Sequence, residues 1–140
     1  MMGAAYDVGD HRRGRPVIRN HRDQEVWQKV SELAAEHRRL VRRLPAQPRQ
    51  GLRAQMPRAA VPISSNIAEG RRSWKRRRGA DHVTIALGAL AEIEALMLLA
   101  HRLEYLAHDD AATFWLLAHR VGRLLSALRR SLDHPPAGQH

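Results

Sequence analysis

Cysteine is absent from the 140 residues, and aromatic residues make up only 4% of them. Without cysteine the chain has no disulfide and no thiolate metal site, which is compatible with the cytosol. The scarcity of aromatic and β-branched residues argues against a sheet protein, whereas the abundant Leu, Ala and Arg favour helices. No run approaches the roughly 18 apolar residues of a membrane span, and no signal-peptide core is present. A cytoplasmic location without membrane association is expected.

Apolar residues recur every three or four positions in four segments, and this spacing predicts four helices. We expect helices from about 22 to 43, from about 49 to 70, from 80 or 81 to about 106, and from Asp109-Asp110, as the cap, to about 132. Short links between them predict an all-α, antiparallel up-down-up-down four-helix bundle. The domain is expected to span residues 20–133, between a disordered basic tail at 1–19 and a disordered C-terminal tail at 134–140.

The second helix contains Pro57 and Pro62, each of which removes a backbone hydrogen bond. We expect a bend near Pro62, with a side chain of the Ser64-Ser65-Asn66 triplet bonding to freed backbone groups. Gly70 is expected to end this helix. In the third helix, Leu96–Leu99 is apolar on every side, so this helix is either central or meets another subunit.

The formal net charge is +10, and it is unevenly distributed. Residues 1–78 hold 19 Lys/Arg against 7 Asp/Glu, a net of +12, and residues 79–140 hold 5 against 7, a net of −2. This asymmetry favours an anionic partner, with nucleic acid ahead of acidic protein or a membrane surface.

Two groups of residues are candidates for contacts with nucleic-acid phosphates. The first is the cluster between the second and third helices, where Trp74 could also stack on a base: Arg71, Arg72, Trp74, Lys75, Arg76, Arg77 and Arg78. The second lies around the turn between the first and second helices: Arg42, Arg43, Arg49 and Arg53. The sequence leaves open whether the two groups form one surface or two. A solvated charged loop is the alternative interpretation of the first group.

No pattern typical of an enzyme is present. Ser64, Ser65, Asn66 and Glu69 have no base at a suitable spacing, and no phosphate-binding loop occurs. Glu104 and His108 have the wrong spacing for a di-iron bundle, which needs Glu-x-x-His pairs on two helices. We therefore expect a non-enzymatic protein without catalytic residues, metal or cofactor.

The segment Arg58–Gly70 reads Arg-Ala-Ala-Val-Pro-Ile-Ser-Ser-Asn-Ile-Ala-Glu-Gly. Together with Asp23–Lys29 and Ala86–Glu94, it resembles the four-helix-bundle family named for proteins encoded in intervening sequences of bacterial 23S rRNA, over about residues 18–132. That family typically reads RRAAVSIPSNIAEG in this segment, so its proline usually stands at the position of Ser64 rather than at Pro62. The shift affects the expected bend rather than the expected fold.

The resemblance implies a ring-shaped homo-oligomer, commonly a homopentamer, without enzymatic activity. Relatives include the accessory variability protein of diversity-generating retroelements, a basic barrel that binds nucleic acid and a reverse transcriptase. The resemblance thus implies RNA or DNA as a partner and admits a reverse transcriptase as another. The alternative is a protein-interaction scaffold, such as an accessory subunit of a reverse transcriptase, that does not bind nucleic acid directly.

Overall fold

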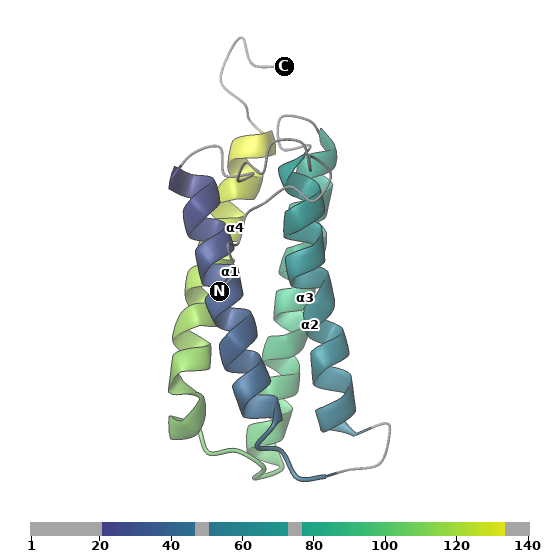
Figure 1. The fold of residues 1–140 in the computed structure, drawn as a ribbon, viewed down its shortest axis with the longest axis vertical. Coiled ribbons are helices and arrows are strands. Elements are labelled where there is room, and N and C mark those ends of the chain that lie inside the picture. The colour runs from purple at the N-terminus through teal and green to yellow at the C-terminus, as the bar shows by residue number, and fades with distance from the viewer. Residues whose placement is uncertain (1–20, 47–50, 73–76, 134–140) are drawn as a thin grey trace, which may run out of the picture.

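The computed structural model describes residues 21–46, 51–72 and 77–133, with the side chain of Arg77 left out. These residues form α1 (His21–Val41), α2 (Leu52–Arg71), α3 (Arg77–Arg102) and α4 (Ala112–Asp133), with a short 3₁₀ helix η1 (Asp109–Ala111) before α4. Figure 1 shows the four long helices side by side, with successive helices running in opposite directions. The predicted all-α four-helix bundle is confirmed, and both predicted tails lie outside the described residues.

Each helix packs mainly against two others, as at the corners of a square. The α2–α3 contact is the most extensive, α3–α4 and α1–α4 follow, and α1–α2 is the smallest. Large apolar side chains fill the centre, and each contributes about 1.5–3 kcal/mol of burial free energy. The largest of the fully buried side chains are Phe114, Leu33, Leu40, Met56, Ile67, Ile93, Met97 and Leu125.

α2 continues through both of its prolines. Pro57 is exposed and Pro62 is half-buried, so neither ring lies in the core. Asn66 Nδ2 donates a hydrogen bond to the carbonyl of Pro62 at 2.8 Å. A hydrogen bond from the polar triplet to the backbone therefore exists, as expected. Because proline has no N–H, Pro62 leaves the carbonyl of Arg58 without its usual helical donor. The Asn66 side chain does not replace that donor, since it bonds to the carbonyl of Pro62 instead.

The link between α2 and α3 is shorter than predicted. Gly70 does not end α2: it is buried inside the helix, which continues to Arg71. The N–H of Arg72 then bonds to the carbonyls of Glu69 and Gly70. α3 begins at Arg77 rather than at 80 or 81. We expected 71–79 to be a loop or a frayed helix start, and residues 77–79 indeed belong to the first turn of α3.

α3 ends at Arg102, four residues before the predicted end. Glu104 adopts a left-handed φ of 64°. The N–H of Glu104 bonds to the His101 carbonyl at 3.0 Å, and the N–H of Tyr105 bonds to the Ala100 carbonyl at 2.9 Å. This pair of bonds is a Schellman motif, which normally places glycine at the left-handed position. The predicted cap residues Asp109 and Asp110 lie in η1 instead, ahead of α4.

Among the described residues, one helical stretch, Arg78–Arg102, has the length and hydropathy of a membrane span. The sequence-based prediction concerned an unbroken run of apolar residues, and this stretch is interrupted by Glu92 and Glu94. The central helix of a soluble bundle meets the same criteria. α3 packs against both α2 and α4 within the bundle.

Candidate nucleic-acid interface

The two predicted cation groups lie at opposite ends of the bundle. α1 ends and α2 begins at one end, while α2 ends and α3 begins at the other (Figure 1). α2 has 20 residues, which at 1.5 Å per residue separate the two ends by about 30 Å. The described cations therefore form two surfaces rather than one.

The structure describes only part of the candidate set. The exposed members are Arg42, Arg43 and Arg53 at the α1–α2 end, and Arg72 and Arg78 at the α2–α3 end. Arg77 is the first residue of α3, and its side chain is not described. Arg49, Trp74, Lys75 and Arg76 lie outside the described residues.

Arg71 occupies a different position from the one predicted. It is only 3% exposed, and its Cζ lies 5.4 Å from the centroid of the Trp27 ring. A guanidinium keeps its charge at any ordinary pH, and the face of an indole ring attracts a cation. Arg71 therefore joins the end of α2 to α1 inside the bundle, and it is not an exposed contact for phosphates.

The exposed cations near the end of α1 differ in their acidic neighbours. Arg39 is paired with Glu36 at 2.6 Å, and its hydrogen bond lowers the pKa of that carboxyl. Arg43 is paired with Asp110 at 3.4 Å.

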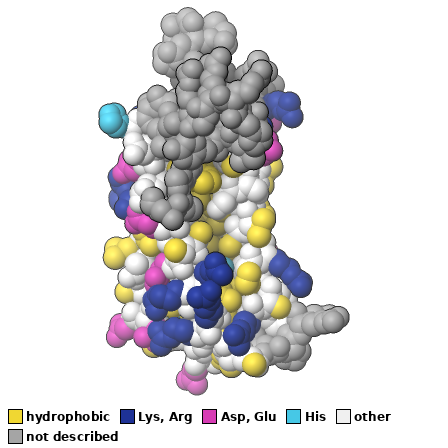
Figure 2. All heavy atoms as spheres, viewed as in Figure 1, with side chains coloured by type: hydrophobic (Ala, Val, Ile, Leu, Met, Phe, Trp, Pro, Cys, Tyr) yellow, Lys and Arg dark blue, Asp and Glu magenta, His cyan; other side chains and the backbone are white. Residues whose placement is uncertain are grey.

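Arg38 and Arg42 have no ion-pair partner within the part of the chain that the structure describes. Arg38 lies in the last turn of α1, and Arg42 directly follows the helix, with its N–H bonded to the Arg38 carbonyl at 3.2 Å. Sequence reasoning missed Arg38 although its i,i+4 spacing from Arg42 was visible. Figure 2 shows Lys and Arg side chains gathered low on the visible face, towards this end of the bundle. We call Arg38 and Arg42 the open pair.

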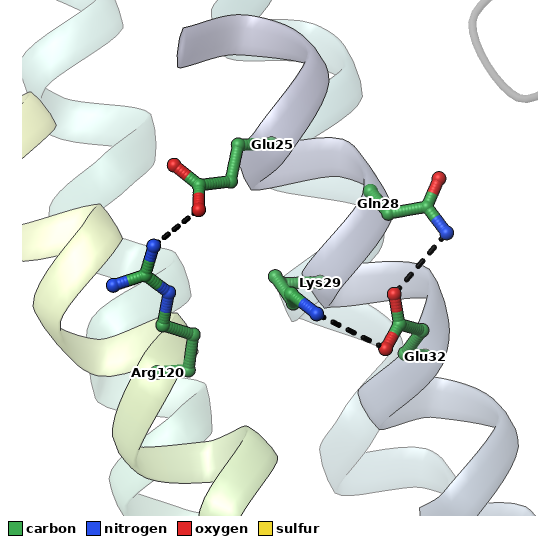
Figure 3. Close-up of polar contacts among 5 residues, drawn as sticks. All are labelled: Glu25, Gln28, Lys29, Glu32 and Arg120. Carbon is green, nitrogen blue, oxygen red and sulfur yellow. Dashed lines mark hydrogen bonds and ion pairs between the residues drawn. The ribbon is translucent and has the colours of Figure 1, made fainter.

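The α1–α4 face, by contrast, neutralises its own cations. Glu25 on α1 is paired with Arg120 on α4 (Figure 3). Lys29 lies 3.3 Å from Glu32, which also accepts a hydrogen bond from Gln28. Because Lys29 and Arg120 each have a carboxylate of the same chain beside them, they attract a polyanion less strongly than the open pair does.

His37, His82 and His101 each have a structural neighbour that explains their position. His37 is buried beside Phe114, with ring centroids 6.0 Å apart, and burial lowers its pKa to about 4. His82 Nδ1 lies 2.9 Å from Asn66 Oδ1. His101 contacts the Leu106 carbonyl through Nδ1 and accepts a hydrogen bond from the Trp115 indole through Nε2. Over residues 21–46, 51–72 and 77–133, no three His, Asp or Glu side chains gather as metal ligands.

A groove of about 480 Å³ lies between α3 and α4, and sequence reasoning did not anticipate it. Leu87 and Leu90 of α3 line one side, and Arg123 and Arg130 of α4 line the other. Glu94 is its only acidic lining residue among those described. The sequence did contain one indication of this groove: Arg123 and Arg130 are seven residues apart, a spacing that places both on one face of a helix.

The comparison with known families supports the resemblance noted in the sequence. The family model described as 23S rRNA-intervening sequence protein matches residues 22–127, about three quarters of the chain. This range covers α1, α2, α3 and most of α4. No curated protein matches the chain significantly. The chain belongs to the 23S rRNA-intervening sequence protein family.

Proposed function

We propose that this member of the 23S rRNA-intervening sequence protein family is a non-enzymatic, cytoplasmic, nucleic-acid-binding subunit of a homo-oligomer. The observation that carries the proposal is the open pair: Arg38 and Arg42 are exposed, one turn apart, and without acidic partners among the described residues. They belong to a chain with a net charge of +10, and the family's name associates it with ribosomal RNA. The bound partner is RNA or DNA, contacted through its phosphates.

The mechanism is electrostatic. Each arginine that neutralises a phosphate releases condensed counterions, so affinity falls as the salt concentration rises. Contacts with phosphates do not by themselves distinguish one nucleotide sequence from another. Two such contacts in one subunit bind weakly, but an oligomer that repeats the open pair in every copy adds these contacts into avidity. Arg72 and Arg78 give each copy exposed cations at its other end.

The test compares an Arg38→Gln/Arg42→Gln variant with a control that loses the same charge elsewhere, Arg58→Gln/Arg129→Gln. Affinity for single-stranded and duplex RNA and DNA is measured by electrophoretic shift at two salt concentrations. We expect the first variant to bind more weakly and with a shallower salt dependence than the control. Equal binding by the two variants would overturn the assignment to the open pair.

The second cation group is tested separately. In an Arg76→Ala/Arg77→Ala/Arg78→Ala variant, we expect weaker binding and a shallower salt dependence, with the oligomer unchanged. Unchanged affinity would contradict a role for this segment.

A protein-interaction scaffold remains the second candidate function, because α3 exposes apolar side chains. Ile85, Leu98 and Leu99 are 52%, 53% and 43% exposed. Exposed apolar surface of this kind marks protein contacts. A scaffold, for example for a reverse transcriptase, would not retard RNA or DNA at physiological salt, whereas the proposed function requires retardation.

A further inference from the structure

The outward face of α3 has the spacing of a helix-pairing seam. Exposed residues follow one another at alternating intervals of three and four, the pattern that brings one stripe of a helix against a partner helix. The seam runs for about 27 Å along α3. Its members are Asp81, Ile85, Gly88, Glu92, Ala95 and Leu99, all of them exposed.

This α3 seam combines apolar residues, small residues and acidic residues. A Cβ added to Gly88 would meet nothing within 4 Å, so the fold of a single chain gives no reason for glycine there. Glycine weakens a helix relative to alanine. Gly88 and Ala95 together allow another helix to approach the backbone closely, and Asp81 and Glu92 carry the seam's charge.

α4 presents a second seam with the opposite charge. Its outward residues are Leu116, His119, Arg123, Ser126 and Arg130. The last four of them line the groove between α3 and α4. Leu116 is 73% exposed. Within the described parts of the chain, neither Arg123 nor Arg130 forms an ion pair.

Gly122 lies in the lining of this groove. A Cβ there would meet only Leu90 Cδ2, at the ordinary contact distance of 3.5 Å. The interior of one chain therefore tolerates alanine at this position as well.

We propose that the α3 seam of one copy docks on the α4 seam of the next, with Glu92 against Arg123. The inference deepens the homo-oligomer of the proposed function by naming its two surfaces. An antiparallel alignment centred on Glu92 and Arg123 brings Leu99 opposite Leu116 and places Ile85 at the level of Arg130, with Asp81 within one further turn. Leu99 then meets the apolar Leu116, and the carboxylate of Glu92 meets the guanidinium of Arg123.

The same residues disfavour a symmetric α3–α3 contact. An antiparallel pair centred on this seam places Glu92 of one copy close to Glu92 of the other, and this repulsion works against a two-fold dimer. A contact between two different surfaces is heterologous, and it continues from copy to copy into a closed ring or an open filament. α3 and α4 occupy neighbouring corners of the bundle, so their outward faces diverge by roughly a right angle. Successive copies are therefore rotated relative to one another, as a closed ring requires.

The test reverses the central charge on each seam. At a fixed concentration, light scattering coupled to size exclusion gives the mass of wild type, Glu92→Arg, Arg123→Glu and the double variant. We expect about hundredfold weaker association in each single variant and recovery in the double variant. Glu69→Arg and Arg58→Glu, which make the same changes on α2, are the controls and should retain the wild-type mass. Circular dichroism checks that every variant remains folded.

Mixing the two single variants separates this arrangement from any symmetric one. Glu92→Arg has arginine at the centre of both seams and Arg123→Glu has glutamate at the centre of both, so each should fail to assemble alone. The mixture should co-assemble with the two variants alternating, into assemblies larger than the heterodimer that a symmetric α3–α3 contact would give. A monomeric wild type, single variants that assemble like wild type, or a mixture that stays monomeric would each overturn the proposal.

Affinity for RNA is measured on the same samples. Loss of RNA binding in Arg123→Glu with no change in assembly would identify the groove as a nucleic-acid surface and reject this interface. If wild type assembles but binds no RNA or DNA, the proposed function fails while the interface stands.

Discussion

The two ends of the bundle each bury a basic side chain, but they accommodate it in different ways. At the α2–α3 end, Arg71 is 3% exposed and lies over the Trp27 ring. Towards the α1–α2 end, His37 is equally buried, and its pKa is lowered to about 4. A guanidinium does not lose its proton in a protein, so a buried guanidinium keeps its charge and is stabilised by a group that attracts cations, here the face of the Trp27 ring. An imidazole avoids the cost of a buried charge by becoming neutral.

The difference shows that the charge counted from the sequence is not the charge that the surface presents. Arg71 adds to the net charge without being exposed, whereas Arg38 and Arg42 of the open pair are exposed and form no ion pair with another described residue. A basic residue type alone therefore does not identify a site for an anion. Exposure and the absence of a neighbouring carboxylate decide which arginines qualify.

The largest expected effect is at the buried arginine. Arg71→Ala removes the long stem packed in the interior and the contact with the Trp27 ring, and we expect a loss of about 3 kcal/mol in the free energy of unfolding. Chemical denaturation measures it. Arg71→Met retains the stem and should lose less, and a double-mutant cycle with Trp27→Leu isolates the ring contact. A loss below about 1 kcal/mol in Arg71→Ala would contradict a structural role for this side chain.

The buried histidine predicts a pH dependence of stability. The folded-state pKa of about 4 lies below the ordinary value of 6.5. Between these two values the unfolded chain binds more protons, so stability is lost as the pH falls from about 6.5 to about 4. The full loss is about 3 kcal/mol. Denaturant titrations across this range measure it.

His37→Leu is the matched variant for this prediction. His37 Nε2 is buried and has no hydrogen-bond partner among the described residues. We therefore expect no large loss of stability at pH 7 and a flatter profile between pH 6.5 and 4. A profile as steep as that of wild type would assign the acid sensitivity to other groups.

A smaller effect is expected at the turn between α3 and α4, also at the α1–α2 end. Glu104 holds the left-handed position of the Schellman motif, where a side chain costs about 1–2 kcal/mol. Glu104→Gly should therefore raise the free energy of unfolding by about 1 kcal/mol. Glu104→Ala, which keeps a Cβ, is the control and should show no comparable gain in the midpoint of thermal unfolding.

The smallest effect on stability belongs to the open pair. Arg38→Gln/Arg42→Gln should change the free energy of unfolding by less than about 0.5 kcal/mol, because both side chains are exposed and unpaired among the described residues. The same variant should reduce the salt slope of nucleic-acid binding by about 2. A large loss of stability would mean that these arginines support the fold.

The fold could be predicted from the sequence because its signals are local. In α4, Phe114, Val121, Leu125 and Leu128 repeat at helical spacing, and all four are buried. The exact ends of the helices could not be predicted in the same way. Gly70 has the residue type of a C-cap, yet α2 continues past it because Arg71 packs on Trp27, a residue 44 positions earlier in the chain. No local pattern reveals such a contact.

The candidate site was only partly predictable for the same reason. Arg42 and Arg43 were both expected to be exposed, and both are. Their different pairing depends on Asp110, which approaches Arg43 only after α4 has packed against α1. The α3–α4 groove likewise depends on which faces of two helices remain uncovered in the bundle.

For the nucleic-acid ligand that we propose, the distance of about 30 Å between the two ends of the bundle sets the shortest strand that can reach both ends. A stacked strand rises about 3.4 Å per nucleotide, so it needs about nine nucleotides to reach from Arg42 at one end to Arg72 at the other. Shorter oligonucleotides engage one end alone. Chain length, more than base sequence, then governs how firmly a strand is held.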